Sequence, residues 1–92
     1  MAKAEKNMYY VYILKSLKNN KSYVGKTSRN VKIRLREHNN KSNKWTRENG
    51  PFKLIYYEKF YCLKDASYRE RFLKSGQGRK LLKLILNHFK GR

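Results

Sequence analysis

Cysteine is nearly absent from this 92-residue chain, which contains only Cys62. A single thiol forms neither a disulfide framework nor a cysteine-based zinc site, so we expect a reducing, cytoplasmic environment. No apolar run approaches the roughly 18 residues of a membrane span. Residues 1–7 lack the apolar stretch of a signal peptide. These absences predict neither a secreted disulfide protein nor an integral membrane protein.

Acidic residues are also scarce, since 6 Asp and Glu stand against 24 Lys and Arg, for a formal net charge of +18. A two-metal nuclease needs several carboxylates that converge on ions about 4 Å apart, and no two of these acids have the spacing to do so. With only 2 histidines, a histidine-rich metal finger is excluded as well. The excess of positive charge predicts a polyanionic partner, with nucleic acid favoured over an anionic membrane surface.

Aromatic residues, in contrast, are abundant: 8 Tyr, 4 Phe and 1 Trp. That number is far too high for a solvated tail, and it predicts a compact core despite the strong self-repulsion of the chain. The length allows one small domain. We expect a flexible tail over residues 1–7, a single domain over 8–90, and a monomer.

The pattern of apolar residues predicts a small α/β (more strictly α+β) fold. Expected strands cover 8–16, 22–27 and 52–61, and expected helices cover 31–39, 65–75 and 79–89. Ser28 or Asn30 is expected to cap the first helix, and the apolar stripe of the last helix includes Phe89. Residues 40–51 are predicted to form a polar loop that holds Trp45. The order β-β-α-β-α-α describes a three-stranded sheet flanked by helices.

The first two strands are predicted to form a hairpin. If Asn19 and Asn20 make a two-residue turn, Tyr23 faces Ser16, and the two-residue period of a strand puts Tyr12 on the same face. A shifted register places Tyr12 and Tyr23 directly opposite each other. Arg34 and His38, four residues apart on the following helix, share one side of it.

These residues carry a family resemblance. Tyr10-Val11-Tyr12 and, after ten intervening residues, Tyr23-Val24-Gly25 resemble the paired motif of the GIY-YIG nuclease superfamily. Lys26, Arg34, His38 and Glu70 follow in the order and spacing of that family, and the likeness covers residues 9 to 80. Tyr10 stands where the first motif has glycine. Asn87 lies too far along the last helix to be assigned the role of an asparagine that many members carry near the metal.

The resemblance implies metal-dependent hydrolysis of a DNA phosphodiester. Glu70 would hold a single Mg²⁺ or Mn²⁺ together with phosphate oxygens and water. Tyr12, or in its place Tyr23, would act as general base, and the cationic surroundings are expected to lower the pKa of the phenol. Arg34 would stabilise the transition state, His38 would support the base or shuttle its proton, and Lys26 would contact phosphate. Gly25 is expected to be structural, allowing close backbone approach beside the site.

Further contacts to nucleic acid are expected from basic and aromatic residues, namely Lys26, Arg34, Lys44, Trp45, Arg69 and Arg79. The absence of a separate recognition element predicts little sequence specificity, and leaves single-stranded, duplex and branched DNA open. Two alternatives compete with the nuclease. One is a non-catalytic basic nucleic-acid-binding protein, and the other is a membrane-surface protein that uses the amphipathic helix 79–90.

Overall fold

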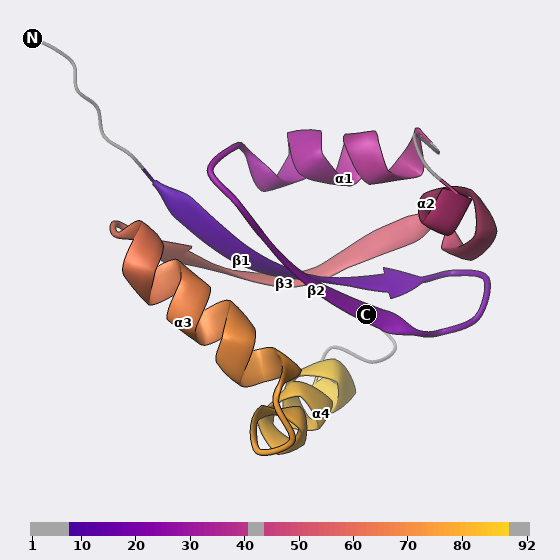
Figure 1. Cartoon of the computed structure of the whole chain (residues 1–92). Helices are drawn as coiled ribbons and strands as arrows, with labels where there is room; N and C mark the ends of the chain where they lie inside the picture. Colours follow the sequence, from indigo (N-terminus) through magenta and orange to yellow (C-terminus); the bar gives the residue numbers. More distant parts are fainter. Residues whose placement is uncertain (1–7, 41–43, 89–92) are drawn as a thin grey trace, which may run out of the picture.

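The computed structural model describes residues 8–40 and 44–88. Its elements, in chain order, are β1 (Tyr9–Ser16), β2 (Ser22–Thr27), α1 (Val31–Asn39), α2 (Lys44–Asn49), β3 (Phe52–Phe60), α3 (Leu63–Lys74) and α4 (Gly78–His88). Figure 1 shows α1 and α2 on one face of the sheet and α3 and α4 on the other. The predicted α+β class and element order are confirmed, with α2 as an additional short helix.

The sheet is antiparallel, with strand order β2-β1-β3. β1 occupies the centre because its run of β-branched and aromatic residues has apolar side chains pointing to both faces. Val11 and Ile13 face α3 and α4, where they pack with Leu73. Tyr12 and Leu14 face α1, where they pack with buried neighbours that include Val31 and Phe52. A strand buried on both sides therefore separates two small cores.

The register of the β1–β2 hairpin differs from both sequence-based alternatives. Leu14 pairs with Tyr23, and Tyr12 pairs with Gly25. The two-residue turn was wrong because residues 17–21 form a longer connection, in which the Ser16 hydroxyl accepts hydrogen bonds from the backbone N–H groups of residues 18 and 19. Asn20 has a φ of 62°, the left-handed conformation that asparagine tolerates in turns. Tyr12 and Tyr23 consequently lie diagonally on one face.

Helix α1 is fixed at both ends, and this fixes the side chains that it presents to the sheet. Of the two predicted caps, Asn30 is the one used: its Oδ1 accepts a hydrogen bond of 2.8 Å from the backbone N–H of Lys32. At the other end the Asn39 side chain accepts from the N–H of Phe52 at 2.7 Å and donates to the carbonyl of the same residue at 3.2 Å. The helix is thereby attached to the first residue of β3.

The structure corrects the sequence-based expectations for α2, α3 and α4. The predicted loop 40–51 contains helix α2, so Trp45 lies on a helix. α3 begins at Leu63, two residues before the expected Asp65, and α4 begins at Gly78. The expected tail 1–7, as well as Phe89 and residue 90 of the expected last helix, lie outside the described residues. Within the described ranges, no helix has the length and apolar character needed to cross a membrane.

Gly25 is a position where only glycine fits. A Cβ built on Gly25 would lie 2.5 Å from both Cζ and Oη of Tyr12, well inside van der Waals contact. We expect Gly25→Ala to displace the Tyr12 ring and to lower the free energy of unfolding by about 1–3 kcal/mol, as measured by urea denaturation. Gly76 is the matched control, because a Cβ there meets nothing within 4 Å. Equal stability of the Gly25→Ala and Gly76→Ala variants would contradict this packing.

Candidate active site

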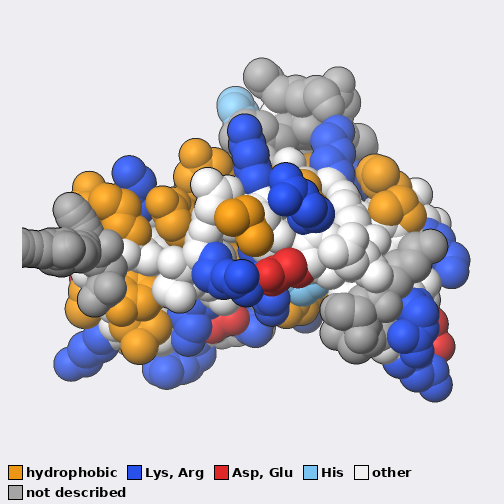
Figure 2. Space-filling model, turned by 90° about the horizontal axis from the view of Figure 1, so that it is seen from above, with side chains coloured by type: hydrophobic (Ala, Val, Ile, Leu, Met, Phe, Trp, Pro, Cys, Tyr) orange, Lys and Arg blue, Asp and Glu red, His pale blue; other side chains and the backbone are white. Residues whose placement is uncertain are grey.

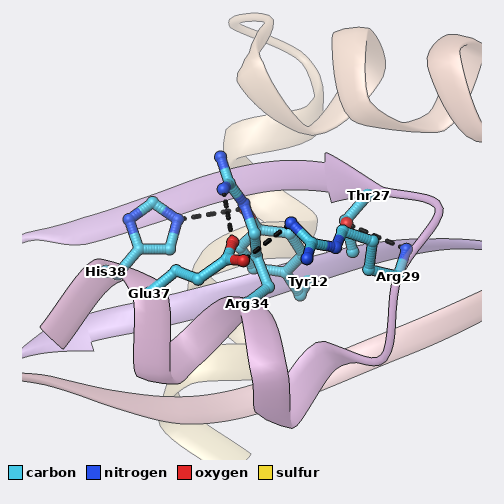
Figure 3. A network of polar contacts seen from close by, with 6 residues as sticks. All are labelled: Tyr12, Thr27, Arg29, Arg34, Glu37 and His38. Carbon is cyan, nitrogen blue, oxygen red and sulfur yellow. Dashed lines mark hydrogen bonds and ion pairs between the residues drawn. The ribbon is translucent and has the colours of Figure 1, made fainter. Parts of the chain in front are cut away.

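The Tyr12 hydroxyl is the centre of a polar cluster between β1 and α1. Its oxygen lies 3.2 Å from Nε2 of His38 and accepts a longer hydrogen bond of 3.4 Å from Nε of Arg34. Figure 3 shows Arg34 and His38 reaching from α1 toward this phenol. Both side chains point to the sheet because they are four residues apart on one side of the helix. Tyr12 itself is 2% exposed.

Tyr23 joins the same cluster through its ring. Its centroid lies 6.4 Å from that of Tyr12 and 5.2 Å from that of His38. On its other side it contacts Trp45 of α2 at 5.1 Å, and Trp45 in turn stacks on Phe52 at 5.3 Å with an interplanar angle of 11°. Edge-to-face and stacked contacts of this kind hold rings in defined orientations. Helix α2 therefore positions Trp45 beside Tyr23, with 42% of the residue exposed.

The expected lowering of the tyrosine pKa was wrong for Tyr12. Burial raises the pKa of Tyr12 above its ordinary value near 10, and the hydrogen bond from Arg34 opposes this without overcoming it. The negative charge of Glu70 also raises the pKa. The sequence displays the many cations around the phenol but not its desolvation. Tyr12 is therefore a neutral phenol at neutral pH, and not a preformed phenolate.

His38 is matched to this neutral phenol. Burial lowers the pKa of His38 below 6.5, and the nearby positive charge of Arg34 lowers it further. A neutral imidazole has one unprotonated nitrogen. When that nitrogen is Nε2, it accepts the hydrogen bond of the Tyr12 hydroxyl. The pair can then transfer the phenolic proton to the imidazole.

Glu37 and Arg29 belong to this network, although sequence reasoning did not select them. Glu37 accepts from Nη1 of Arg34 at 2.9 Å and pairs with Nη1 of Arg29 at 2.7 Å (Figure 3). The hydrogen bond from Arg34 lowers the pKa of Glu37, and Arg29 contributes. The sequence held a signal for the contact between Arg34 and Glu37, because Glu37 lies three residues after Arg34 on the predicted helix.

Lys26 and Glu70 lie on the α3 face of the sheet. Nζ of Lys26 donates to Oγ of Ser67 at 2.9 Å and is 3.7 Å from a carboxylate oxygen of Glu70. The other oxygen of Glu70 accepts from Lys74 at 3.1 Å. Lys26 follows Gly25, which the Tyr12 ring covers from the opposite face. β2 is an edge strand of the sheet. Glu70 and Tyr12 lie on opposite faces of it, and the negative charge of Glu70 still contributes to the raised pKa of Tyr12.

The donor set fits a metal that takes few ligands from the protein. Among residues 8–40 and 44–88, no three His, Cys, Asp or Glu side chains come together as a complete metal site. Glu70 offers two carboxylate oxygens, its side chain is 20% exposed, and the ammonium groups of Lys26 and Lys74 pair with it. Mg²⁺ commonly binds through one or two carboxylates and completes its shell with water and phosphate oxygens. Glu70 is compatible with that type of binding.

The remaining candidate contacts to nucleic acid are spread over the domain. Lys44 pairs with Glu48 on the surface of α2. Arg79 and Tyr23 are among the residues that line a hollow of about 250 Å³ between β2, α3 and α4. Arg69 makes two hydrogen bonds, of 2.8 and 2.9 Å, with Glu58 on the opposite edge strand, β3. The structure thus places Arg79 beside the α3/α4 side of β2 and places Arg69 at the opposite edge of the sheet.

Comparisons with known proteins agree with this geometry. The family model of the GIY-YIG catalytic domain matches residues 8–83. A UPF0213 protein of Clostridium perfringens (strain 13 / Type A) is 42% identical over 79 residues, covering 85% of this chain and 83% of the relative. One from Staphylococcus haemolyticus is 38% identical, covering 84% and 93%. The solution NMR structure of a UPF0213 protein from Bacillus halodurans has a TM-score of 0.54 and 30% identity, and covers 91% of this chain and 88% of that one.

Fold, paired tyrosine motifs and family match define a nuclease-type domain. The chain belongs to the GIY-YIG family, and its likeness to small UPF0213 proteins extends over nearly its whole length. Membership of this family supports endonuclease activity on nucleic acid.

The lowered pKa of His38 makes stability depend on pH. The unfolded chain binds a proton at His38 near pH 6.5, whereas the folded protein does so only at lower pH. The stabilising contribution is therefore complete above pH 6.5 and is lost as the pH falls through the folded pKa. We expect the free energy of unfolding to decrease between pH 7.5 and about 5, and His38→Gln to flatten this slope.

His88→Gln is the matched control, because it removes the second histidine at the exposed end of α4. Urea denaturation over the same pH range measures both variants. An unchanged slope in His38→Gln would show that His38 is not held neutral by the fold.

Proposed function

We propose that this protein is a metal-dependent DNA endonuclease that hydrolyses phosphodiester bonds with a tyrosine-activated water. The observation that carries the proposal is the buried Tyr12 hydroxyl, which lies within hydrogen-bond distance of His38 and Arg34. The negative charge of Glu70 also acts on this hydroxyl and raises its pKa. A general base, a group that accepts its proton, a cation and a metal-binding carboxylate can together carry out metal-dependent hydrolysis of a phosphodiester. Here they come from β1, α1 and α3.

Tyr12 is proposed as general base, with His38 as its proton acceptor. A neutral phenol of raised pKa cannot activate water by itself, but it can take a proton from water while it passes its own proton to Nε2 of His38. The water oxygen attacks phosphorus, and the departing oxygen leaves with the electron pair of the broken bond. Tyr23, half-buried beside both rings, orients the water or replaces Tyr12 as the base.

Arg34 is proposed to bind the scissile phosphate. Its guanidinium carries five N–H donors, of which those on Nε and Nη1 face Tyr12 and Glu37 in the free protein. The contact to Tyr12 is long, at 3.4 Å, and exchanging it for a phosphate oxygen leaves a lone pair of the phenol available to the attacking water. Positive charge at the phosphate stabilises the additional negative charge of the transition state. Lys26, at the adjacent edge, supplies a further phosphate contact.

Glu70 is proposed to hold a single Mg²⁺ or Mn²⁺. When bound, the metal neutralises negative charge on the phosphate oxygens. The role of the chain itself is to present one carboxylate at the β2 edge, 3.7 Å from Lys26 and 3.1 Å from Lys74. A metal bound to Glu70 would take the place of these two ammonium groups as its counter-ion.

The substrate is proposed to be DNA bound through its backbone. Figure 2 shows basic side chains spread over the α1 side of the molecule and only small acidic areas among them. Such a distribution attracts phosphate without reading bases, which supports low sequence specificity. Trp45, which contacts Tyr23, and Arg79, which lines the hollow on the α3/α4 side of β2, are proposed as further contacts to the strand.

Removal of either key group tests the proposal. We expect Tyr12→Phe and Glu70→Ala to reduce the rate of DNA cleavage in Mg²⁺ or Mn²⁺ by about 10²- to 10⁴-fold. Affinity for DNA should remain within a few-fold of wild type, because neither substitution removes a positive charge. Gel assays with labelled single-stranded, duplex and branched DNA, with and without EDTA, provide the measurement.

Tyr68→Phe and Glu48→Ala are the matched controls, since both residues are exposed and lie outside the cluster. They should cleave like wild type. Wild-type protein that binds all three DNA forms but cuts none of them with either metal would contradict the proposal, and would favour a non-catalytic nucleic-acid-binding protein.

A further inference from the structure

One carboxylate holds two guanidinium groups beside the Tyr12 hydroxyl. Oε1 of Glu37 accepts from Nη1 of Arg34 at 2.9 Å, and Oε2 is 2.7 Å from Nη1 of Arg29. Each arginine thus has its own oxygen (Figure 3). The side chains of Arg29 and Arg34 are 60% and 38% exposed, so an anion from solution can reach both.

The arrangement matches the chemistry of a phosphate. Carboxylate and phosphodiester groups both present two oxygens that share a negative charge, and arginine binds either through charge-assisted hydrogen bonds. Two guanidiniums that bracket the two oxygens of Glu37 are therefore spaced to bracket two non-bridging oxygens of a phosphate. Without an anion between them, the two positive charges would repel each other.

The backbone that carries Arg29 is held in place. Its N–H donates to Oγ1 of Thr27 at 3.0 Å, and Thr27 is buried at the end of β2. The next residue, Asn30, caps α1. Arg34 and Glu37 lie on successive turns of that helix, three residues apart. The turn between β2 and α1 thus presents Arg29 to the same place that the helix presents Arg34.

We propose that Arg29 is a second phosphate-binding residue of this site, and that Glu37 holds Arg29 and Arg34 together until a DNA phosphate replaces it. The inference rests on the proposed function, in which Arg34 binds the scissile phosphate. It adds a direct substrate contact from the β2–α1 turn, and it assigns Glu37 as a positioning residue. The free protein keeps its two cations assembled because the carboxylate occupies the place of the substrate anion.

Cleavage kinetics of Arg29→Met test the direct contact. We expect it to raise KM for DNA about tenfold, whereas Arg36→Met, which removes the same charge from the exposed side of α1, changes KM far less. Arg29→Met should still raise KM more than Arg36→Met does when each substitution is made separately in a Glu37→Gln background. If Arg29 served only to neutralise Glu37, the two variants would have equal KM values in that background, and this result would overturn the proposal.

Glu37→Gln tests the positioning role through a split between kcat and KM. Loss of the bridge leaves Arg29 and Arg34 unassembled in the free protein, so kcat/KM should fall about tenfold. The value of kcat should not change, because phosphate has already replaced Glu37 in the substrate complex. Glu48→Gln removes one negative charge from α2 and should not lower kcat/KM. Equal kcat/KM values for the Glu37→Gln and Glu48→Gln variants would contradict the role assigned to Glu37.

A binding measurement separates this inference from the proposed function. Inorganic phosphate is titrated into the wild-type protein, and the arginine Nε–Hε signals are followed by NMR, with Arg36 as internal control. We expect Arg29 and Arg34 to shift together with one dissociation constant. A shift of Arg34 without Arg29 overturns the inference. A protein that never cleaves DNA overturns the proposed function, and leaves this titration to decide on the phosphate site.

Discussion

The contact between the Tyr12 ring and Gly25 is the constraint on which the rest of the site depends. The phenol crosses the edge strand where β2 has no side chain, and Cζ and Oη occupy the space of a Cβ. This path carries the hydroxyl from the central strand to His38 and Arg34 on α1. In this chain the tyrosine of the first motif, Tyr12, therefore requires the glycine of the second, Gly25.

The same contact explains how a domain of this size assembles a polar site. Burial of Tyr12 keeps the phenol neutral, burial of His38 keeps the imidazole neutral, and the two share one hydrogen bond. The charged groups remain nearer to solvent, at Arg34 on one face of β2 and at Lys26 and Glu70 on the other. The buried pair, Tyr12 and His38, is neutral, and the charged side chains lie nearer to solvent. The site therefore avoids the large free-energy cost of burying an unpaired ion.

Much of this arrangement was predictable from the sequence. Strong β-propensity gave the three strands, the Arg34 and His38 spacing placed both on one side of α1, and the Asn30 cap fixed the start of that helix. Helix α2 escaped prediction because residues 40–51 are polar and lack an apolar period. The hairpin register depended on hydrogen bonds to the Ser16 hydroxyl, and the direction of the Tyr12 pKa depended on burial. The burial of Tyr12 and the contact between Glu37 and Arg29 arise from the packing of separate segments, whereas the Ser16 hydrogen bonds are local contacts in a turn whose length the sequence leaves open.

The titration of Tyr12 tests the central claim most directly. Tyrosine labelled with ¹³C at Cζ reports ionisation of each phenol by NMR, and the Tyr12→Phe variant assigns the signal. A phenol desolvated over Gly25 should have a pKa above the ordinary value near 10. A Tyr12 pKa below that value would mean that the surrounding cations dominate over burial. The site would then hold a preformed phenolate, and the neutral relay from Tyr12 to His38 would be wrong.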